Sequence, residues 1–204
     1  MDIEWFCDSR VDHVSYDMFR EMVKAGCRCL YFGIESGNQR ILDYYKKRIT
    51  PEQSENAVRK ARKAGVDVIV GSFIVGAPDE TKREIMNTLK FVNKLDIDVP
   101  QINVLGVLRG TDVWNDLVAR GFINEDEYWE KTVCVPRVSP LTVPMEEIGP
   151  MIYECFRSFY LSPKKLLKQI FRTVKSSFRM AAVLNNIPTY SVWGETLRRG
   201  VRYD

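Results

Sequence analysis

"KAGCRCLYFGIESG" spans residues 24–37, and a related stretch, "KAGVDVIVGSFIVG", spans residues 63–76. Both start with the same three residues, continue through a largely apolar run and end in glycine, at an offset of 39 residues. A glycine after a helical segment favours the end of that helix, and a nearly continuous apolar run is typical of a strand covered on both faces. The repeat therefore predicts two successive units of helix, glycine stop, strand and glycine turn.

The same alternation extends over the first 121 residues. Strands are predicted at 3–7, 27–34, 66–75 and 99–108, with helices between them at 16–25, 39–47, 51–64, 81–94 and 112–120. Strands that alternate with helices indicate a parallel sheet with right-handed crossovers. We therefore expect three parts, which are the α/β portion (1–121), a proline-rich connector (122–144) and a helical extension (145–204). Helices in the extension are predicted at 145–160, 163–176, 178–186 and 189–199.

Composition and charge narrow the class of protein. The 204 residues are 45% hydrophobic and 28% charged, which is ordinary for a soluble globular chain. No apolar run approaches the ~20 residues of a membrane span, and the first residues lack the pattern of a signal peptide, so we expect a cytoplasmic protein. Five cysteines, without a CxxC spacing, and one histidine predict neither a disulfide framework nor a metal site built from this chain alone.

Polar or glycine-rich residues follow each predicted strand, where function collects in parallel α/β folds. Glu35 ends the second strand between Gly33 and Gly37. A carboxylate offers two acceptor oxygens, which can take both hydroxyls of a ribose, and small neighbours allow close approach. The alternative is that Glu35 is a carboxylate near the start of the following helix, where negative charge is favourable.

Two strand-end motifs carry a resemblance to a known family. The first motif comprises Gly33, Glu35, Ser36, Gly37, Gln39, Ile41, Leu42, Lys47 and Thr50. The second comprises Phe73, Ile74, Gly76, Pro78, Glu80 and Thr81. Together they resemble the later strands of radical S-adenosylmethionine (SAM) enzymes. The similarity is greatest to the group with a cobalamin-binding domain, which includes iron–sulfur oxidoreductases like the Mg-protoporphyrin monomethyl ester cyclase.

The resemblance implies a fold and a reaction. The fold is an α/β partial (β/α) TIM-type barrel, of which this chain would hold about the last four of six parallel strands, followed by an α-helical carboxyl-terminal extension. The reaction is reductive cleavage of SAM at a [4Fe–4S] cluster, which yields a 5′-deoxyadenosyl radical that takes hydrogen from a small-molecule substrate. The resemblance leaves the substrate class open and implies cobalamin as a further cofactor bound by a separate domain.

The resemblance also implies roles for single residues. By matched position, Glu35 would bind the ribose hydroxyls, and the strand around Ile74 and Gly76 would hold the adenine. Residues 104–108 would form the other wall of the adenine pocket. The full set of predicted cofactor-binding residues is Arg10, Glu35, Ser36, Gly37, Ile74, Gly76, Glu80, Val104 and Leu105.

Two departures from the family pattern are visible. Arg109 stands where the family usually has proline, and the cysteine loop CxxxCxxC that holds the cluster is not in this sequence. The resemblance therefore implies that the cluster ligands lie outside this chain, in a missing amino-terminal part of the same protein. We also expect self-association through the unpaired edge of strand 3–7, since exposed backbone donors and acceptors favour pairing.

Other functions are compatible with these residues. One is a barrel lyase or isomerase with a phosphate-bearing substrate, in which Glu35 is a general acid–base group. Another is a non-catalytic interaction module. The basic carboxyl-terminal helices, which carry Lys164, Lys165, Lys168, Arg172, Lys175 and Arg179, are compatible with a solvated face or with contact to an acidic surface.

Overall fold

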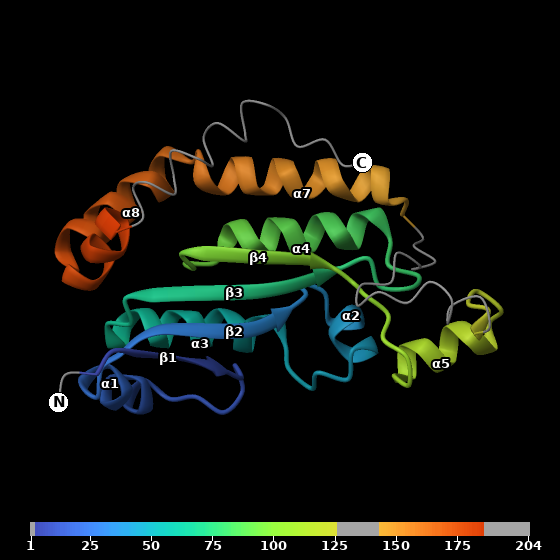
Figure 1. Cartoon of the computed structure of the whole chain (residues 1–204), viewed down its shortest axis with the longest axis horizontal. Coiled ribbons are helices and arrows are strands. Elements are labelled where there is room, and N and C mark those ends of the chain that lie inside the picture. Colours follow the sequence, from blue (N-terminus) through green and yellow to red (C-terminus); the bar gives the residue numbers. More distant parts are fainter. Residues whose placement is uncertain (1–2, 126–142, 186–204) are drawn as a thin grey trace.

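The sheet is the centre of the structure, a computed structural model that describes residues 3–125 and 143–185. Its four strands are parallel and lie side by side in chain order, β1-β2-β3-β4 (Figure 1). They are β1 (Trp5–Ser9), β2 (Cys27–Glu35), β3 (Val68–Val75) and β4 (Val99–Val104). The predicted α/β class with a parallel sheet is confirmed. Within the described residues β1 and β4 are edges, as the partial barrel requires.

Helices follow each of the strands. They are α1 (Tyr16–Lys24), α2 (Gln39–Tyr44), α3 (Pro51–Ala64), α4 (Lys82–Lys94) and α5 (Asp112–Ala119). Local sequence sets their ends. Thr50 and Gln53 form a reciprocal capping box at the start of α3, and Gly65 ends it with a φ of +93° that favours glycine. The predicted repeat therefore corresponds to two strand-and-helix units of the sheet.

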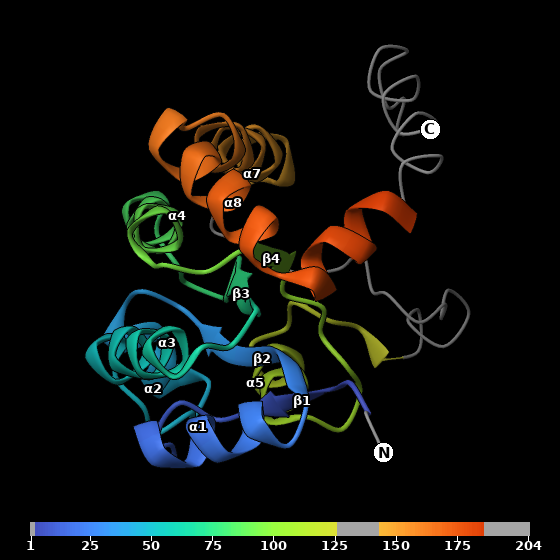
Figure 2. The ribbon, with the colours of Figure 1, turned by 90° about the vertical axis from the view of Figure 1, so that its left-hand side faces the viewer.

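The two faces of the sheet differ in burial. One row of paired residues runs Asp8, Tyr31, Val70 and Val99, and all four are partly or fully exposed. The adjacent row runs Ser9, Phe32, Gly71 and Pro100, and the last three are buried. Helices α1, α3 and α4 lie on the side of the second row (Figure 2). The first row belongs to what we call the open face.

Helices α7 (Met145–Tyr160) and α8 (Pro163–Lys175) form the helical extension. Helix α7 packs on α4, and its Ile148, Cys155 and Phe159 are buried in the same core as the sheet. The extension therefore shares its core with the barrel portion. The predicted helix 189–199 and most of the predicted connector lie outside the described residues. No helix in the described part of the chain has the length and apolar character to cross a membrane.

The fourth strand is shorter than predicted. The sequence pattern predicts a strand to residue 108, but β4 ends at Val104. The backbone N–H of Leu105 makes the last bond to β3, at 2.8 Å from the carbonyl oxygen of Val75. Gly76 then turns β3 away with a φ of +82°, so residues after Leu105 have no neighbouring strand to pair with. Apolar residues beyond that point pack in a small separate cluster around Trp114 of α5.

A buried carboxylate joins α8 and the helical residues 177–185 to the amino-terminal edge of the sheet. The Asp98 side chain is 4% exposed and lies within ion-pair distance of Arg62, Arg172 and Arg179. Asp98 also accepts a 2.8 Å hydrogen bond from the backbone N–H of Ile69 at the start of β3. The acidic surface that the basic helices contact is therefore provided in part by this chain itself. We call Asp98 and its three arginines the arginine bracket.

Candidate functional site

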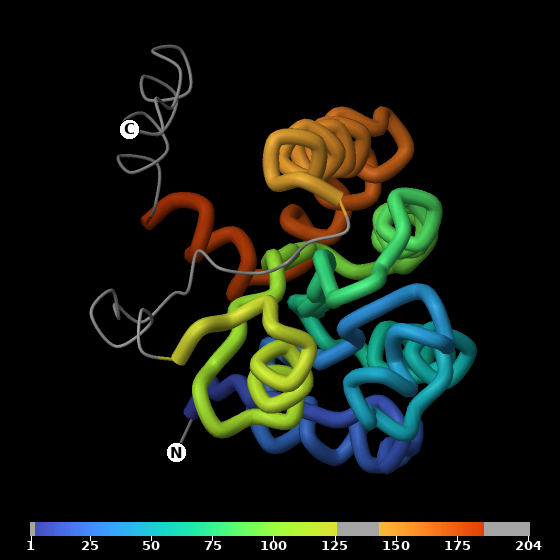
Figure 3. The backbone as a smooth tube through the Cα atoms, turned by 90° about the vertical axis from the view of Figure 1, so that its right-hand side faces the viewer, coloured from blue at the N-terminus to red at the C-terminus, as the bar shows by residue number. Residues whose placement is uncertain are grey.

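The candidate site lies at the carboxyl-terminal edge of the sheet, which faces the viewer in Figure 3. The loops after β1, β2, β3 and β4 meet at this edge, as parallel strands require. Strained backbone is concentrated here. Glu35, Lys46, Arg48 and Asp79 are the non-glycine residues of positive φ in the described ranges, and they lie at the end of β2 or between β2 or β3 and the next long helix. Strained conformations persist where the surrounding structure enforces them, and they cluster at functional sites.

Glu35 occupies the most constrained position of the edge. The register of β2 against β3 shifts between Gly33 and Glu35, which marks a bulge at the end of the strand. Glu35 itself has a φ of +64°, and the backbone N–H of Ser36 donates to the carbonyl oxygen of Ile34 at 2.9 Å. The Glu35 side chain points back over the strand, since its Oε1 would lie 2.9 Å from a Cβ on Gly33.

The Glu35 carboxylate is held by a lysine. Its Oε1 lies 2.7 Å from Nζ of Lys47, and the Glu35 side chain is only 11% exposed. Lys47 comes from the loop between α2 and α3, where Lys46 and Arg48 on either side both have positive φ. The loop conformation thus places one ammonium group against one nearly buried carboxylate. Lys47 belongs to the first sequence motif, but the sequence pattern predicts no role for it at the site.

The two glycines beside Glu35 make room for protein atoms. A Cβ on Gly33 would lie 2.9 Å from Oε1 of Glu35 and 3.3 Å from Nζ of Lys47. A Cβ on Gly37 would lie 2.8 Å from Cβ of Phe91 on α4. Both glycines are thus required by contacts within the protein, and the expectation that they also open space for a ribose stays a prediction. Gly33 accommodates the ion pair, and Gly37 allows the turn to pack on α4.

Ser36 faces away from the open face. Its hydroxyl is fully buried and lies 3.0 Å from the Thr88 hydroxyl of α4, while the backbone N–H groups of Gly37 and Asn38 donate to Thr88 and Ser36, respectively. The Asn38 amide also donates to the carbonyl oxygen of Glu84 at 2.8 Å. This network fixes the turn after Glu35 to α4. Ser36 and Gly37 therefore position Glu35, and their role as direct cofactor contacts stays a prediction.

Arg10 reaches the same edge from the loop after β1. Its guanidinium donates to both carboxylate oxygens of Asp12, at 3.0 and 2.8 Å, and to the carbonyl oxygen of Lys47 at 3.2 Å. The Asp12 carboxylate in turn raises the pKa of Arg10. Arg10 thus lies beside the loop that carries the lysine partner of Glu35, and its side chain remains 54% exposed.

Glu80 is buried in the loop after β3. Its Oε2 accepts from the backbone N–H groups of Gly76 and Ala77, at 2.6 and 3.0 Å. This pairing closes the loop, so Glu80 anchors the backbone where Gly76 bends. Its Oε1 is buried without a hydrogen-bond partner in the described part of the chain, and burial raises the pKa of this carboxyl group.

Tyr45 extends this group of polar side chains and was missed from the sequence. Its hydroxyl, like Oε1 of Glu80, is buried without a hydrogen-bond partner among the residues described. Burial raises the pKa of Tyr45, and the nearby negative charges of Glu80 and Glu35 act in the same direction. The sequence gives little indication of this role, because a tyrosine near the end of an amphipathic helix usually packs against the core.

The predicted adenine wall is corrected by the strand register. Ile74 pairs with Asn103 and lies on the open face, whereas Val75 pairs with Val104 on the helix-covered face. Val104 therefore packs in the core and cannot face Ile74 across a pocket. Leu105, one residue later, follows Asn103 on the open side and is partly exposed. The side chains available beside Ile74 are thus those of Asn103 and Leu105.

The described residues do not provide a cluster site. No group of three or more His, Cys, Asp or Glu side chains within 3–125 and 143–185 could hold a metal ion. Cys7, Cys27 and Cys29 lie on strands β1 and β2, and burial raises the pKa of each thiol, which disfavours the thiolate that iron requires. A [4Fe–4S] cluster therefore does not fit this part of the chain.

Comparison with known proteins gives matches to one superfamily. Residues 2–92 match the model of the radical SAM superfamily. An uncharacterized methyltransferase of Pyrococcus horikoshii is 39% identical over 171 residues, which are 84% of this chain and 37% of the relative. A tRNA-2-methylthio-N(6)-dimethylallyladenosine synthase of Aliivibrio fischeri is 34% identical over 83 residues, which are 40% of this chain and 18% of the relative. The chain thus spans well under half the length of these relatives.

Solved structures share the fold. Coproporphyrinogen III oxidase (HemN) from Escherichia coli, described as a radical SAM enzyme, superposes with a TM-score of 0.54 at 18% identity, over 79% of this chain and 32% of that one. The radical SAM methyltransferase TsrM from Kitasatospora setae gives a TM-score of 0.53 at 20% identity, over 56% of this chain and 23% of that one. The resemblance found in the two strand-end motifs is confirmed, because residues 2–92, which contain both motifs, match the model of the radical SAM superfamily.

Proposed function

We propose that this chain supplies the ribose and adenine side of the SAM site of a radical SAM enzyme. When bound at a reduced [4Fe–4S] cluster, SAM supplies a 5′-deoxyadenosyl radical. The cluster ligands would come from outside this chain, which covers only 37% of its Pyrococcus relative. The names of the relatives favour transfer of a methyl or methylthio group as the reaction class. We also propose a cytoplasmic location and a separate domain that binds cobalamin, since TsrM was solved with cobalamin bound.

The observation that carries this proposal is the geometry of Glu35. A carboxylate that is 11% exposed, held by Lys47 and turned back over the open face by strained backbone is poorly explained as a simple helix-end charge. An ordinary carboxylate near a helix start needs neither a left-handed φ nor a glycine to make room for it. The two hydroxyls of a ribose would donate hydrogen bonds to the carboxylate edge that Lys47 leaves free.

The adenine would lie along the open face beside Ile74, with Asn103 and Leu105 as neighbours in place of Val104. Apolar contact and backbone groups suit an adenine ring, and Gly76 allows close approach at the strand end. The alternative of a lyase or isomerase gains no support from Lys47, because its ammonium is engaged by Glu35 and is not a free amine. No observation favours the interaction module over an enzyme.

The test compares two variants in the longer protein that carries this chain, with its cluster reconstituted. Glu35→Gln retains the shape but loses charge and one acceptor, and it should weaken SAM binding about tenfold or more, since each charge-assisted bond contributes on the order of 1.5–3 kcal/mol. Lys47→Met leaves both carboxylate oxygens and should weaken SAM binding less. Calorimetric SAM affinity, iron content and melting temperature are measured for each. Unchanged SAM affinity in Glu35→Gln, with a lowered melting temperature in both variants, would mean that the ion pair is only structural.

A further inference from the structure

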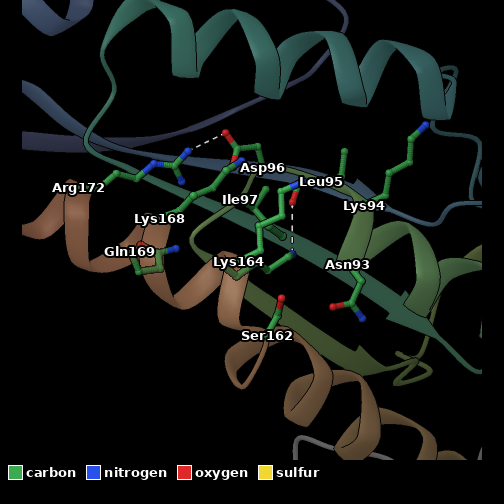
Figure 4. Close-up of a pocket in the computed structure, with 11 residues that line it drawn as sticks. Asn93, Lys94, Leu95, Asp96, Ile97, Ser162, Lys164, Lys168, Gln169 and Arg172 are labelled. Atoms are coloured by element: carbon green, nitrogen blue, oxygen red, sulfur yellow. Dashed lines mark hydrogen bonds and ion pairs between the residues drawn. The ribbon is translucent and has the colours of Figure 1, made fainter.

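A second site lies at the opposite edge of the sheet. A cavity of about 230 Å³ opens between residues 93–97, which join α4 to β4, and the first turns of α8. Figure 4 shows its lining, in which basic and polar side chains from α8 face the loop. The cavity lies at the amino-terminal ends of β3 and β4, so it is separate from the edge that carries Glu35.

The charges around this cavity do not balance. Asp96 is the acidic residue of the lining, and it is already paired with Arg172 at 2.7 Å and with Lys168 at 3.4 Å. Within the described residues, Lys164 and Lys165 have no carboxylate within the 4.0 Å of an ion pair. The lining therefore has an excess of positive charge, which favours an anion.

Lys165 is the residue of the lining whose surroundings most favour an anion. Its ammonium lies 3.5 Å from the centre of the Phe159 ring and 3.5 Å from the carbonyl oxygen of Leu95, which are weak partners for a half-buried charge. Burial, with a smaller effect from the nearby Lys168, lowers the pKa of Lys165 to about 8, although Asp96 and Cys155 oppose the shift. An anion in the cavity would stabilise this charge.

The start of α8 adds donors without net charge. Ser162 is the N-cap residue, but its hydroxyl makes no capping hydrogen bond, so the first backbone N–H groups of this 13-residue helix have no side-chain acceptor. The side-chain carbonyl oxygen of Gln169 accepts from Arg179, which leaves its NH₂ group for another acceptor. Free N–H groups, hydroxyl and amide donors, and ammonium groups together are the set that binds phosphate oxygens.

We propose that this cavity binds a phosphate group. Phosphate carries up to two negative charges and several acceptor oxygens, which match two unpaired ammonium groups and the neutral donors beside them. A carboxylate ligand would use fewer of these donors, and a metal ion is disfavoured by the positive charge. The phosphate can belong to inorganic phosphate, to a nucleotide or to an RNA backbone, and the experiment distinguishes these sources.

The test uses the 204-residue chain and a matched pair of variants. Lys165→Met removes the charge but retains an apolar stem over Phe159. The control, Lys175→Met, removes an ammonium that also lies over an aromatic ring, 4.1 Å from the centre of Phe171, at the far end of α8 and outside the cavity lining. Lys164→Met provides a second variant in case Lys165→Met does not fold, which circular dichroism and the melting temperature report.

Binding of inorganic phosphate, adenosine 5′-monophosphate, adenosine and a short single-stranded RNA is measured by calorimetry at two salt concentrations. We expect phosphate and the nucleotide to bind, adenosine not to bind, and Lys165→Met to weaken binding about tenfold, while the control stays within about twofold. Binding of the RNA alone, weakened by Lys165→Met and not by the control, would support the proposal and assign the phosphate to a nucleic acid. Absence of binding by all phosphate probes, or equal loss in both variants, would overturn it.

Discussion

Glu35 shows how a single residue can be placed by its backbone. A non-glycine residue of positive φ costs roughly 1–3 kcal/mol, so the fold must hold it in place. Here the neighbouring serine bonds to α4, Gly33 leaves room for the carboxylate, and Lys47 binds it at 2.7 Å. Every one of these contacts aims the carboxylate over the open face. The strained backbone of Glu35 is therefore part of what positions the carboxylate at the candidate site.

A second carboxylate, Glu84, gives a prediction about pH. Hydrogen bonds from Arg40, at 2.6 and 2.7 Å, and from Thr81 lower its pKa from 4.5 to about 2. The unfolded chain then binds a proton at higher pH than the folded chain does. The stabilisation is present above about pH 4.5 and is lost as the pH falls through about 2.

Glu84→Gln should lower the free energy of unfolding at pH 7 by about 1–2 kcal/mol, because Arg40 is half exposed and solvent screens the pair. The difference from the parent protein should shrink toward zero between pH 4.5 and pH 2. Urea unfolding at several pH values measures this difference. A difference that stays constant over the whole range would show that the loss arises from the helix cap and not from the ion pair.

At the residue scale, a site residue could be predicted from the sequence only where its residue type and immediate neighbours indicated a binding role. Glu35 stands out in the sequence, because an acidic residue between two glycines ends an apolar strand. The register of β3 against β4 cannot be predicted from the sequence. The sequence therefore does not show that Val104 faces the core while Ile74 faces the open side. The Glu35–Lys47 pair depends on two left-handed residues in a loop, which no local pattern predicts.

At the scale of elements, helix ends were the most predictable feature. Threonine, proline and glutamine at fixed spacing predict the capping box of α3, and the structure confirms both of its hydrogen bonds. Strand ends were less predictable, since β4 stops where its neighbour β3 turns away. A helix end is decided by local bonds, but a strand end is decided by its partner.

This difference gives a test with a built-in control. Thr50→Ala removes the hydroxyl that accepts from the backbone N–H of Gln53 at 3.2 Å, and it should lower the free energy of unfolding by about 1 kcal/mol. Ser162→Ala changes the N-cap residue of α8, whose side chain makes no capping bond, and should have almost no effect. Denaturant unfolding of both variants measures the comparison. Equal losses would show that cap identity, and not the bond, determines stability.

For the whole molecule, the arginine bracket is the principal polar connection between the sheet and the carboxyl-terminal helices. Asp98→Asn retains the volume but removes the carboxylate that pairs with Arg179 and leaves Arg62 and Arg172 with Asp96 alone. Removing one partner from a buried ion pair costs about 3–5 kcal/mol, and we expect a loss in this range. Hydrogen exchange should also become faster in α8 and in residues 177–185.

Asp96→Asn is the matched control for that variant. Asp96 also pairs with Arg172 and Lys168, but its side chain is 37% exposed, so water can replace the lost contacts. The expected loss is about 1 kcal/mol or less. If both variants lose the same stability, or if exchange in α8 does not change in Asp98→Asn, the bracket does not hold the helices.

The exposed edge of the sheet leads to a prediction of self-association. Phe6 on β1 is 77% exposed on the open face, and no further strand pairs with β1 within the described residues. Sedimentation velocity should show a dimer or larger species that becomes monomeric in Phe6→Lys. Leu167→Lys, on the exposed face of α8, is the control, because Leu167 is 68% exposed but lies away from β1. A monomer at all concentrations, or dissociation only in the control, would contradict this prediction.

The arginine bracket also has a consequence for synthesis on the ribosome. Asp98 and Arg62 emerge while the sheet is being made, but Arg172 and Arg179 are translated much later. Amino-terminal parts of a chain fold first, so the nascent sheet holds Asp98 with one arginine until residues 172 and 179 have been translated. A chain that terminates before residue 172 retains the sheet sequence yet lacks two of the three partners of a buried charge. The helical residues that carry Arg172 and Arg179 thus distinguish chains that extend past residue 179 from chains truncated before residue 172, and the truncated chains should be the preferred substrates of cellular proteases.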